Sequence, residues 1–224
     1  KFYIQETTEY MRQSLKVWAE LGFSFDVVST GMILSAEQAA LVSDFCEQSA
    51  KKGALVFVDP IMGDEGKLYN GVGEETIAHM RKMVAVADCI VPNYTEAAYL
   101  ADMPYHEDMT EEEARALTIR LHEMGAKSVV VTSAKVDGEN CVVGYDGTEG
   151  EFFRIPFDLI PVRFVGTGDI FAAVMLGRLV DGVPLQESTH RAMDAVRTMI
   201  DRNRDKEDKY LGIPIETCLE VLDE

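Results

Sequence analysis

Gly166-Thr167-Gly168-Asp169 stands directly before the apolar run Ile170–Leu176. A helix start leaves several backbone N–H groups without partners, and its dipole favours an anion there. The two glycines let the backbone come close to a ligand, and Asp169 would lie in the first turn, where a carboxylate is stabilised. The pattern suits an anion hole for a transferred phosphoryl group with a base at its edge. It suits an ordinary helix start with an acidic first turn equally well.

Further polar side chains follow segments that are apolar and rich in β-branched residues, as buried strands are. They are Asp59 after Ala54–Val58, Asn93 and Glu96 after Asp88–Pro92, and Thr132 and Ser133 at the end of Ser128–Ser133. Each has a structural alternative. Asp59-Pro60 is an ordinary strand end, Asn93 with Glu96 is a reciprocal helix cap, and the glycine-rich stretch after Asp59 is compatible with a flexible loop.

The elements that must position these residues alternate between strand and helix. Predicted helices cover Thr8–Leu21, a segment opened by a Ser35/Gln38 capping box, Glu74–Ala87, a segment from Tyr94, one opened by a Thr110/Glu113 box, and Leu185–Arg202. With the strand Phe25–Thr30 and those above, this order predicts an α/β fold of three layers, helices covering both faces of a mostly parallel sheet. Asp146-Gly147, between Asn140–Tyr145 and Glu151–Pro156, predicts an antiparallel hairpin at one edge.

Ligands bind beyond the carboxyl ends of the strands in such sheets. We therefore expect Asp59, Glu96, Thr132 and Asp169 to converge at one edge, although they are far apart in sequence. The apolar run Ile170–Leu176 predicts a helix that is buried on nearly all sides.

Composition narrows the class of protein. The 224 residues carry 21 Lys+Arg against 39 Asp+Glu, a net charge of −18, which disfavours nucleic acid and anionic membranes as partners. No apolar run approaches a membrane span, and no repeat or low-complexity linker divides the chain. The four scattered cysteines are typical of free thiols in a reducing compartment, so we expect a cytoplasmic protein.

Two common nucleotide motifs are missing from the sequence. It has no Gly followed by four residues and Gly-Lys-Ser/Thr, and no Gly-x-Gly-x-x-Gly after the first predicted strand. A P-loop ATPase and a simple dinucleotide enzyme are therefore both disfavoured.

Four segments resemble the signatures of pyridoxal kinase, a family of the ribokinase-like superfamily, in order and at fitting separations. They are VDPIMGDEGKLY (Val58–Tyr69), VPNYTEAAYL (Val91–Leu100), VVVTS (Val129–Ser133) and GTGDIFAA (Gly166–Ala173). The last motif is shared widely in the superfamily, so it supports phosphoryl transfer more than any one substrate. The Asp-Pro…Gly-Asp…Gly-x-x-Tyr loop is more specific to pyridoxal kinases.

The resemblance implies a role for each matching residue. Asp169 corresponds to the catalytic base that takes the proton of the substrate's hydroxymethyl group, and Gly166, Thr167 and Gly168 correspond to the anion hole. The carboxylates implied near the phosphates and their metal ions are Asp59, Asp64 and Glu96. The remaining residues implied on the nucleotide side are Tyr69, Asn93, Thr132 and Ser133. ATP with Mg²⁺ is the implied donor, K⁺ is a common helper in the family, and relatives are commonly homodimers.

Three departures from the family pattern bear on these expectations. The opening βαβ region, which supplies part of the substrate pocket, is absent, so we expect residues 1–224 to form a single ribokinase-like domain lacking it. Met32 stands where the family often has a tyrosine near the pyridine ring, so the preferred vitamer stays open. Val91 replaces a frequent threonine, which leaves only a backbone carbonyl for a K⁺ site at that position.

The expected function is phosphorylation of the 5′-hydroxymethyl group of a B6 vitamer by ATP. Two alternatives remain open from the sequence. One is hydroxymethylpyrimidine kinase, which belongs to the same superfamily and takes a similar hydroxymethyl substrate. The other is a nucleotide- or vitamer-binding protein that keeps the fold without catalysis, which the retention of Asp169 and the whole anion hole disfavours.

Overall fold

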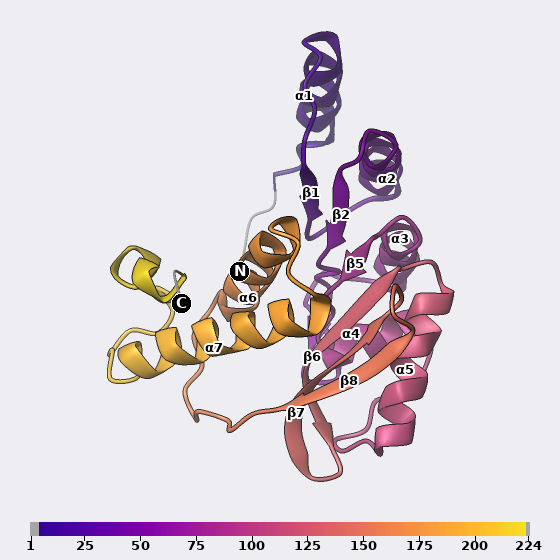
Figure 1. Cartoon of the computed structure of the whole chain (residues 1–224). Coiled ribbons are helices and arrows are strands. Elements are labelled where there is room, and N and C mark those ends of the chain that lie inside the picture. Colours follow the sequence, from indigo (N-terminus) through magenta and orange to yellow (C-terminus); the bar gives the residue numbers. More distant parts are fainter. Residues whose placement is uncertain (1–4, 223–224) are drawn as a thin grey trace.

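A six-stranded sheet forms the centre of the protein in a computed structural model that describes residues 5–222 (Figure 1). Its strands, in spatial order, are β1 (Val27–Thr30), β2 (Leu55–Val58), β5 (Cys89–Ile90), β6 (Ser128–Val136), β7 (Glu139–Asp146) and β8 (Glu151–Pro156). The first four pair in parallel, and β7 and β8 extend the sheet antiparallel at one edge. The predicted mostly parallel sheet with an antiparallel edge hairpin is therefore confirmed.

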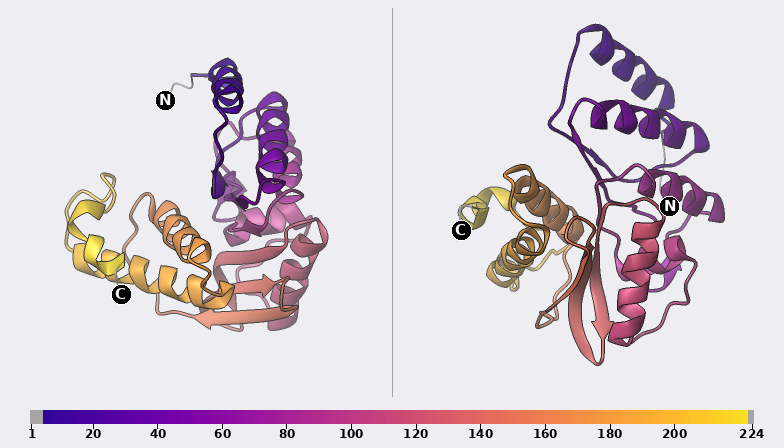
Figure 2. Two further views of the ribbon diagram at one scale, coloured as in Figure 1. Left: turned by 45° about the horizontal axis from the view of Figure 1, so that its top comes forward. Right: turned by 45° about the vertical axis from the view of Figure 1, so that its right-hand side comes forward.

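Helices lie on both faces of this sheet. They are α1 (Thr8–Glu20), α2 (Ala36–Ala50), α3 (Glu74–Val84), α4 (Tyr94–Ala101), α5 (Glu111–Glu123), α6 (Thr167–Val180) and α7 (Leu185–Asn203), followed by the 3₁₀ turns Ile215–Thr217 and Leu219–Leu222. Alternate strand residues point to opposite faces: Val56 and Val58 pack in the core under α2 to α5, whereas Phe57 packs under α6 and α7. Figure 2 (right) shows the resulting three layers.

The helix after the Gly-Thr-Gly-Asp motif differs from expectation. In α6, Ile170, Phe171 and Met175 are buried, but Gly177 and Val180 are exposed. The prediction that this helix is buried on nearly all sides is wrong, because α6 lies in an outer layer and only one of its faces meets the sheet and α7. An apolar composition shows that a helix is packed somewhere, but it does not identify the packed face.

Helix ends follow the predicted capping residues with two differences. Thr110 and Glu113 form the predicted capping box at the start of α5. Ser35 caps α2 by accepting from the Gln38 N–H, but the Gln38 side chain accepts from Leu34 instead of completing the box. Helix α3 ends at Val84, short of the predicted boundary, and its last residues continue as turns with i→i−3 hydrogen bonds.

The glycine-rich stretch after Asp59 is an ordered turn. Strands β3 (Gly63–Asp64) and β4 (Lys67–Leu68) pair antiparallel and form a small hairpin, here called the acidic hairpin for its Asp64 and Glu65. Gly63 is required by close approach, because a Cβ there would lie 2.5 Å from the Lys67 carbonyl oxygen.

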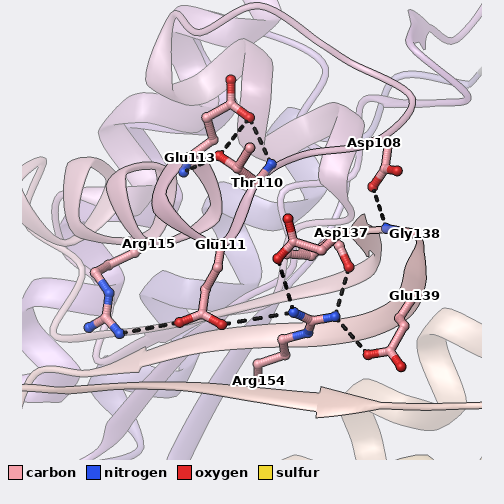
Figure 3. A network of polar contacts seen from close by, with 10 residues as sticks. Asp108, Thr110, Glu111, Glu113, Arg115, Asp137, Gly138, Glu139 and Arg154 are labelled. Carbon is pink, nitrogen blue, oxygen red and sulfur yellow. Dashed lines mark hydrogen bonds and ion pairs between the residues drawn. The ribbon is translucent and has the colours of Figure 1, made fainter.

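At the carboxyl end of β6, a polar network fixes the β6–β7 turn against α5 and β8 (Figure 3). The Arg154 guanidinium of β8 donates to the Val136 carbonyl at 2.7 Å and to Glu139 at 2.8 Å, and it pairs with Glu111 of α5. These contacts tie α5 to the long hairpin. They therefore help to hold the strand that carries Thr132.

Candidate active site

The Gly-Thr-Gly-Asp motif forms the first turn of α6, as predicted, and is here called the anion-hole turn. Gly166 is the N-cap, with φ 85° and ψ 7°, a left-handed conformation that favours glycine. No side chain caps the helix. A Cβ at Gly168 would meet nothing within 4 Å. The start of α6 therefore offers backbone N–H groups beside open space, which suits an anion.

Asp59 and Asp169 come together from different layers. Asp59 follows β2 and its N–H donates to the Thr30 carbonyl of β1 at 3.0 Å, while Asp169 lies in the exposed first turn of α6. Burial raises the pKa of Asp59 to about 7, and the nearby Asp169 carboxylate adds to this rise. The two carboxylates thus interact across the carboxyl edge of the sheet, where the parallel topology was expected to place them.

Asn93 and Glu96 do form the helix cap that was the structural alternative. Asn93 Oδ1 accepts from the Glu96 N–H at 3.0 Å, and Glu96 Oε2 accepts from the Asn93 N–H at 2.9 Å, which completes a capping box on α4. Glu96 does more than this. Its Oε1 accepts from the N–H groups of Met62 at 3.0 Å and Gly63 at 3.4 Å, so the side chain also holds the start of the acidic hairpin.

Glu96 is a buried acid, with 3% of its surface exposed. Burial raises its pKa to about 7 against the lowering effect of the hydrogen bonds from Met62 and Asn93, and the charge of Asp59 adds to the rise. Asp59, Glu96 and Asp169 are therefore one electrostatic group. Negative charges that lie close together disfavour simultaneous ionisation. A bound cation or an added proton would therefore reduce the repulsion between these carboxylates.

Helix α4 fastens the acidic hairpin at two more points. Asn93 Nδ2 donates to the Gly63 carbonyl at 2.8 Å, and Thr95 Oγ1 accepts from the Gly66 N–H at 2.8 Å. Thr95 was not among the residues singled out from the sequence. Its partner is 29 positions away, so no local spacing could reveal it.

Tyr69 and Asp64 lie with an arginine that the motif analysis missed. Arg163 donates to Asp64 Oδ2 and to Glu65 Oε1, each at 2.6 Å. Burial raises the pKa of Tyr69, the charges of Asp64 and Glu96 raise it further, and Arg163 lowers it. The tyrosine therefore lies within the field of the whole group. The available signal was an arginine three positions before Gly166 in a strongly acidic protein.

Thr132 and Ser133 lie beside Asn93. Thr132 forms an isolated parallel bridge with Asn93, and its N–H donates to the Pro92 carbonyl at 2.9 Å. Ser133 has φ 53° at the point where the β6–β7 register shifts between Val131 and Ala134. A non-glycine residue in the left-handed region is uncommon, and such strain clusters at functional sites.

Met32 follows β1 at the same edge of the sheet and is 47% exposed. Near it, the Thr30 hydroxyl is buried and has no hydrogen-bond partner within residues 5–222. A buried hydroxyl is normally paired. Thr30 is therefore a third residue, after Thr95 and Arg163, that sequence reasoning did not single out.

The carboxylates do not form a ready-made metal cage. Among the residues that the structure describes, no three His, Cys, Asp or Glu side chains are grouped closely enough to hold a metal ion by themselves. Mg²⁺ nevertheless suits this site, because it prefers oxygen ligands and usually takes only one or two carboxylates together with substrate phosphates and water. Asp59 and Asp64 are the carboxylates best suited to this. Both oxygens of the buried Glu96 accept backbone N–H groups, whereas Asp64 is partly exposed and one of its two oxygens accepts from an exposed arginine side chain.

Within residues 5–222, each helix is too short or too polar to cross a membrane.

Known proteins match this geometry and sequence. The family described as "Phosphomethylpyrimidine kinase" matches residues 5–212. A pyridoxal kinase of Arabidopsis thaliana is 32% identical over 171 residues, which cover 73% of this chain and 53% of the relative. The chain thus spans about half the length of the curated relatives it matches.

Solved structures share the fold over the whole chain. A protein of Bacteroides thetaiotaomicron, named as a candidate phosphomethylpyrimidine kinase and solved with pyridoxal, is 32% identical with a TM-score of 0.93, covering 100% of this chain and 80% of that one. Pyridoxal kinase from Lactobacillus plantarum is 26% identical with a TM-score of 0.85, covering 99% and 79%. These matches confirm the predicted ribokinase-like fold and the resemblance to pyridoxal kinase, and the chain belongs to the phosphomethylpyrimidine kinase family.

Proposed function

We propose that this protein is an ATP-dependent kinase that phosphorylates the 5′-hydroxymethyl group of a B6 vitamer. The observation that carries the proposal is the pairing of an uncapped helix start, Gly166 to Gly168, with two carboxylates at its edge, Asp169 and Asp59. Phosphoryl transfer needs positioning, neutralisation of phosphate charge and a base aimed at the attacking hydroxyl. This edge of the sheet offers all three.

Each residue has a distinct task in the proposed reaction. Asp169 accepts the proton of the substrate hydroxyl as the oxygen attacks. The N–H groups of the anion-hole turn stabilise negative charge that develops on the transferred group. Asp59 and Asp64 would hold Mg²⁺, which when bound neutralises the phosphate oxygens. Asn93, Glu96 and Thr95 keep the acidic hairpin in place through hydrogen bonds to its backbone.

The remaining parts of the proposal concern the surroundings of the reaction. Tyr69, Thr132 and Ser133 would contact the nucleotide, and Met32 would line the vitamer pocket. A K⁺ ion would use the backbone carbonyl of Val91. We further propose one kinase domain over residues 1–224, a homodimer as relatives commonly form, and a cytoplasmic location; four buried free cysteines support a reducing compartment.

The second candidate is hydroxymethylpyrimidine kinase. The description of the matching family favours it, because that description names a pyrimidine kinase. The Gly-Asp-x-Gly-x-x-Tyr loop from Gly63 to Tyr69 and the curated pyridoxal kinase relatives favour a B6 vitamer instead.

Turnover by the whole protein separates these possibilities. ATP consumption should be measured with pyridoxal, pyridoxine, pyridoxamine and hydroxymethylpyrimidine in separate reactions. We expect a B6 vitamer to be the best substrate, and Asp169→Asn to lower kcat by about 10²–10⁴, the usual contribution of a general base. Asp181→Asn, which changes the carboxylate at the other end of α6, is the matched control and should leave kcat unchanged.

Three results would count against the proposal. Preference for hydroxymethylpyrimidine would favour the second candidate. No turnover with any substrate would favour a binding protein of the same fold. Near-normal kcat in Asp169→Asn would remove Asp169 as the base.

A further inference from the structure

Arg163 joins two loops that come from distant parts of the sequence. It precedes the anion-hole turn by three residues, and it donates to Asp64 and Glu65 of the acidic hairpin, 99 and 98 positions away. Each contact is 2.6 Å, short for a charge-assisted hydrogen bond. One guanidinium thus spans the gap between the segment expected to bind phosphate and the segment expected to bind a metal.

Both ends of this bridge are anchored. The backbone of the acidic hairpin forms hydrogen bonds with the side chains of Glu96, Asn93 and Thr95 at the start of α4. On the other side, Phe164 is buried next to the arginine and fixes the chain that leads into α6. Because both segments are anchored at their bases, Arg163 meets Asp64 and Glu65 at the exposed turn of the acidic hairpin and links that turn to the chain before α6.

The bridge also creates a conflict over Asp64. The Asp64 side chain is 35% exposed. Its Oδ1 accepts from the Glu65 N–H, and its Oδ2 accepts from Arg163, whose side chain is 72% exposed. A divalent cation that binds Asp64 must share or displace that guanidinium. An exposed arginine moves at little energetic cost, because an ion pair at the surface adds little stability.

We propose that Arg163 is a positioning residue that competes with the divalent cation for Asp64 and so keeps the acidic hairpin closed onto the anion-hole turn until a metal binds. Release of the guanidinium then leaves a cation beside the anion-hole turn, where the charge of a bound phosphate is expected. In this way metal binding at one loop and phosphate binding at the other become coupled. The inference rests on the proposed function only in taking Asp64 as a metal-associated carboxylate.

The test measures binding of Mn²⁺ alone to the whole protein, by titration calorimetry or by the Mn²⁺ resonance signal, without nucleotide or vitamer. We expect Arg163→Met to tighten Mn²⁺ binding by about two- to tenfold, the range that one or two exposed ion pairs span. Arg163→Lys keeps the charge but loses the two-pronged contact, so its affinity should fall between those of the wild type and Arg163→Met.

Lys67→Met is the matched control for bulk charge. Lys67 lies opposite Asp64 in the acidic hairpin register and carries the same charge as Arg163. Its replacement should change Mn²⁺ affinity clearly less than Arg163→Met does. Hydrogen exchange of the peptide covering residues 62–70 provides a second measurement, and we expect faster exchange in Arg163→Met than in the wild type or Lys67→Met.

Different outcomes would contradict different parts of the proposal. Mn²⁺ affinity that is unchanged or weaker in Arg163→Met, or tightened equally by Lys67→Met, would overturn the competition. An unchanged exchange rate in residues 62–70 would overturn the closing role. Because neither measurement needs turnover, an enzyme inactive on every vitamer but with the expected affinities would refute the proposed function alone, whereas an active enzyme with unchanged affinities would refute only the role of Arg163.

Discussion

At the scale of single residues, Asp59 shows how the candidate site opposes the stability of the fold. Its carboxyl group lies at the end of β2 near Asp169. Burial raises the pKa of this group to about 7, and the negative charge of Asp169 adds a smaller part of the rise. The folded protein therefore keeps a proton on Asp59 up to about pH 7, whereas the unfolded chain releases it near the ordinary value of about 3.9. Stability must then fall as pH rises between these two values.

The fall in stability with rising pH gives a direct prediction for Asp59→Asn. The amide stays neutral at every pH, so the variant should melt at a higher temperature than the wild type at pH 8, and the difference should vanish near pH 4. Each kcal/mol gained corresponds to about 2–4 °C for a protein of this size. Melting curves from pH 4 to 8 in buffer with a chelator provide the measurement. An equal difference at both ends of that range would contradict the pKa argument.

At the scale of elements, α6 shows which glycines are required by conformation. Gly166 is left-handed at the N-cap, where a Cβ is strained. Gly177, also in α6, has helical backbone and open space around it, since a Cβ there would meet nothing within 4 Å. The sequence places both glycines in one motif-bearing segment, and only backbone geometry separates the required one from the replaceable one.

The two alanine variants should therefore act in opposite directions. Gly166→Ala should destabilise the protein by about 1–2 kcal/mol through left-handed strain and lower turnover by disturbing the anion-hole turn. Gly177→Ala should stabilise it by about 0.5–1 kcal/mol, because alanine favours helix, and leave turnover intact. Denaturant midpoints and kcat for both proteins test this. A stabilised Gly166→Ala would show that the N-cap tolerates a side chain.

The sequence predicted the elements and the edge at which the site residues meet, because strand–helix alternation and the parallel topology are local and general signals. It did not predict the contacts that join them. The bond from Gly66 to Thr95 and the pairs from Arg163 to Asp64 and Glu65 depend on how distant loops meet. The exposed face of α6 was also missed, since composition does not show which side of a helix meets the sheet.

At the scale of the whole molecule, the net charge of −18 opposes the ligand that the site is proposed to bind. A nucleotide approaching this protein meets long-range repulsion before it reaches the anion-hole turn and Arg163. Salt screens such repulsion over about 10 Å at 0.1 M ionic strength, whereas contacts within the site are screened much less. The approach and the bound state therefore respond differently to ionic strength.

We accordingly expect KM for ATP to fall, by about twofold, as ionic strength rises from about 20 to about 150 mM with Mg²⁺ and K⁺ held constant. Tetramethylammonium chloride can supply the added ions without entering a K⁺ site. Initial rates at several ATP concentrations give the measurement. A KM that rises with salt would mean that local cations, not the overall charge, govern nucleotide capture.

The bridge made by Arg163 also has a consequence for how the protein folds. It joins residues 99 positions apart, so the chain between them, which includes β5 through β8, must fold back before the guanidinium can reach Asp64. Contacts of such long sequence separation lose the most chain entropy on closing and form late. The hydrogen bonds between the acidic hairpin and α4 join residues only 29 and 30 positions apart, so they are expected to form before the contact with Arg163. The edge of the sheet that carries the candidate site is thus expected to be the last part of the molecule to assemble and the first to open when the protein is stressed.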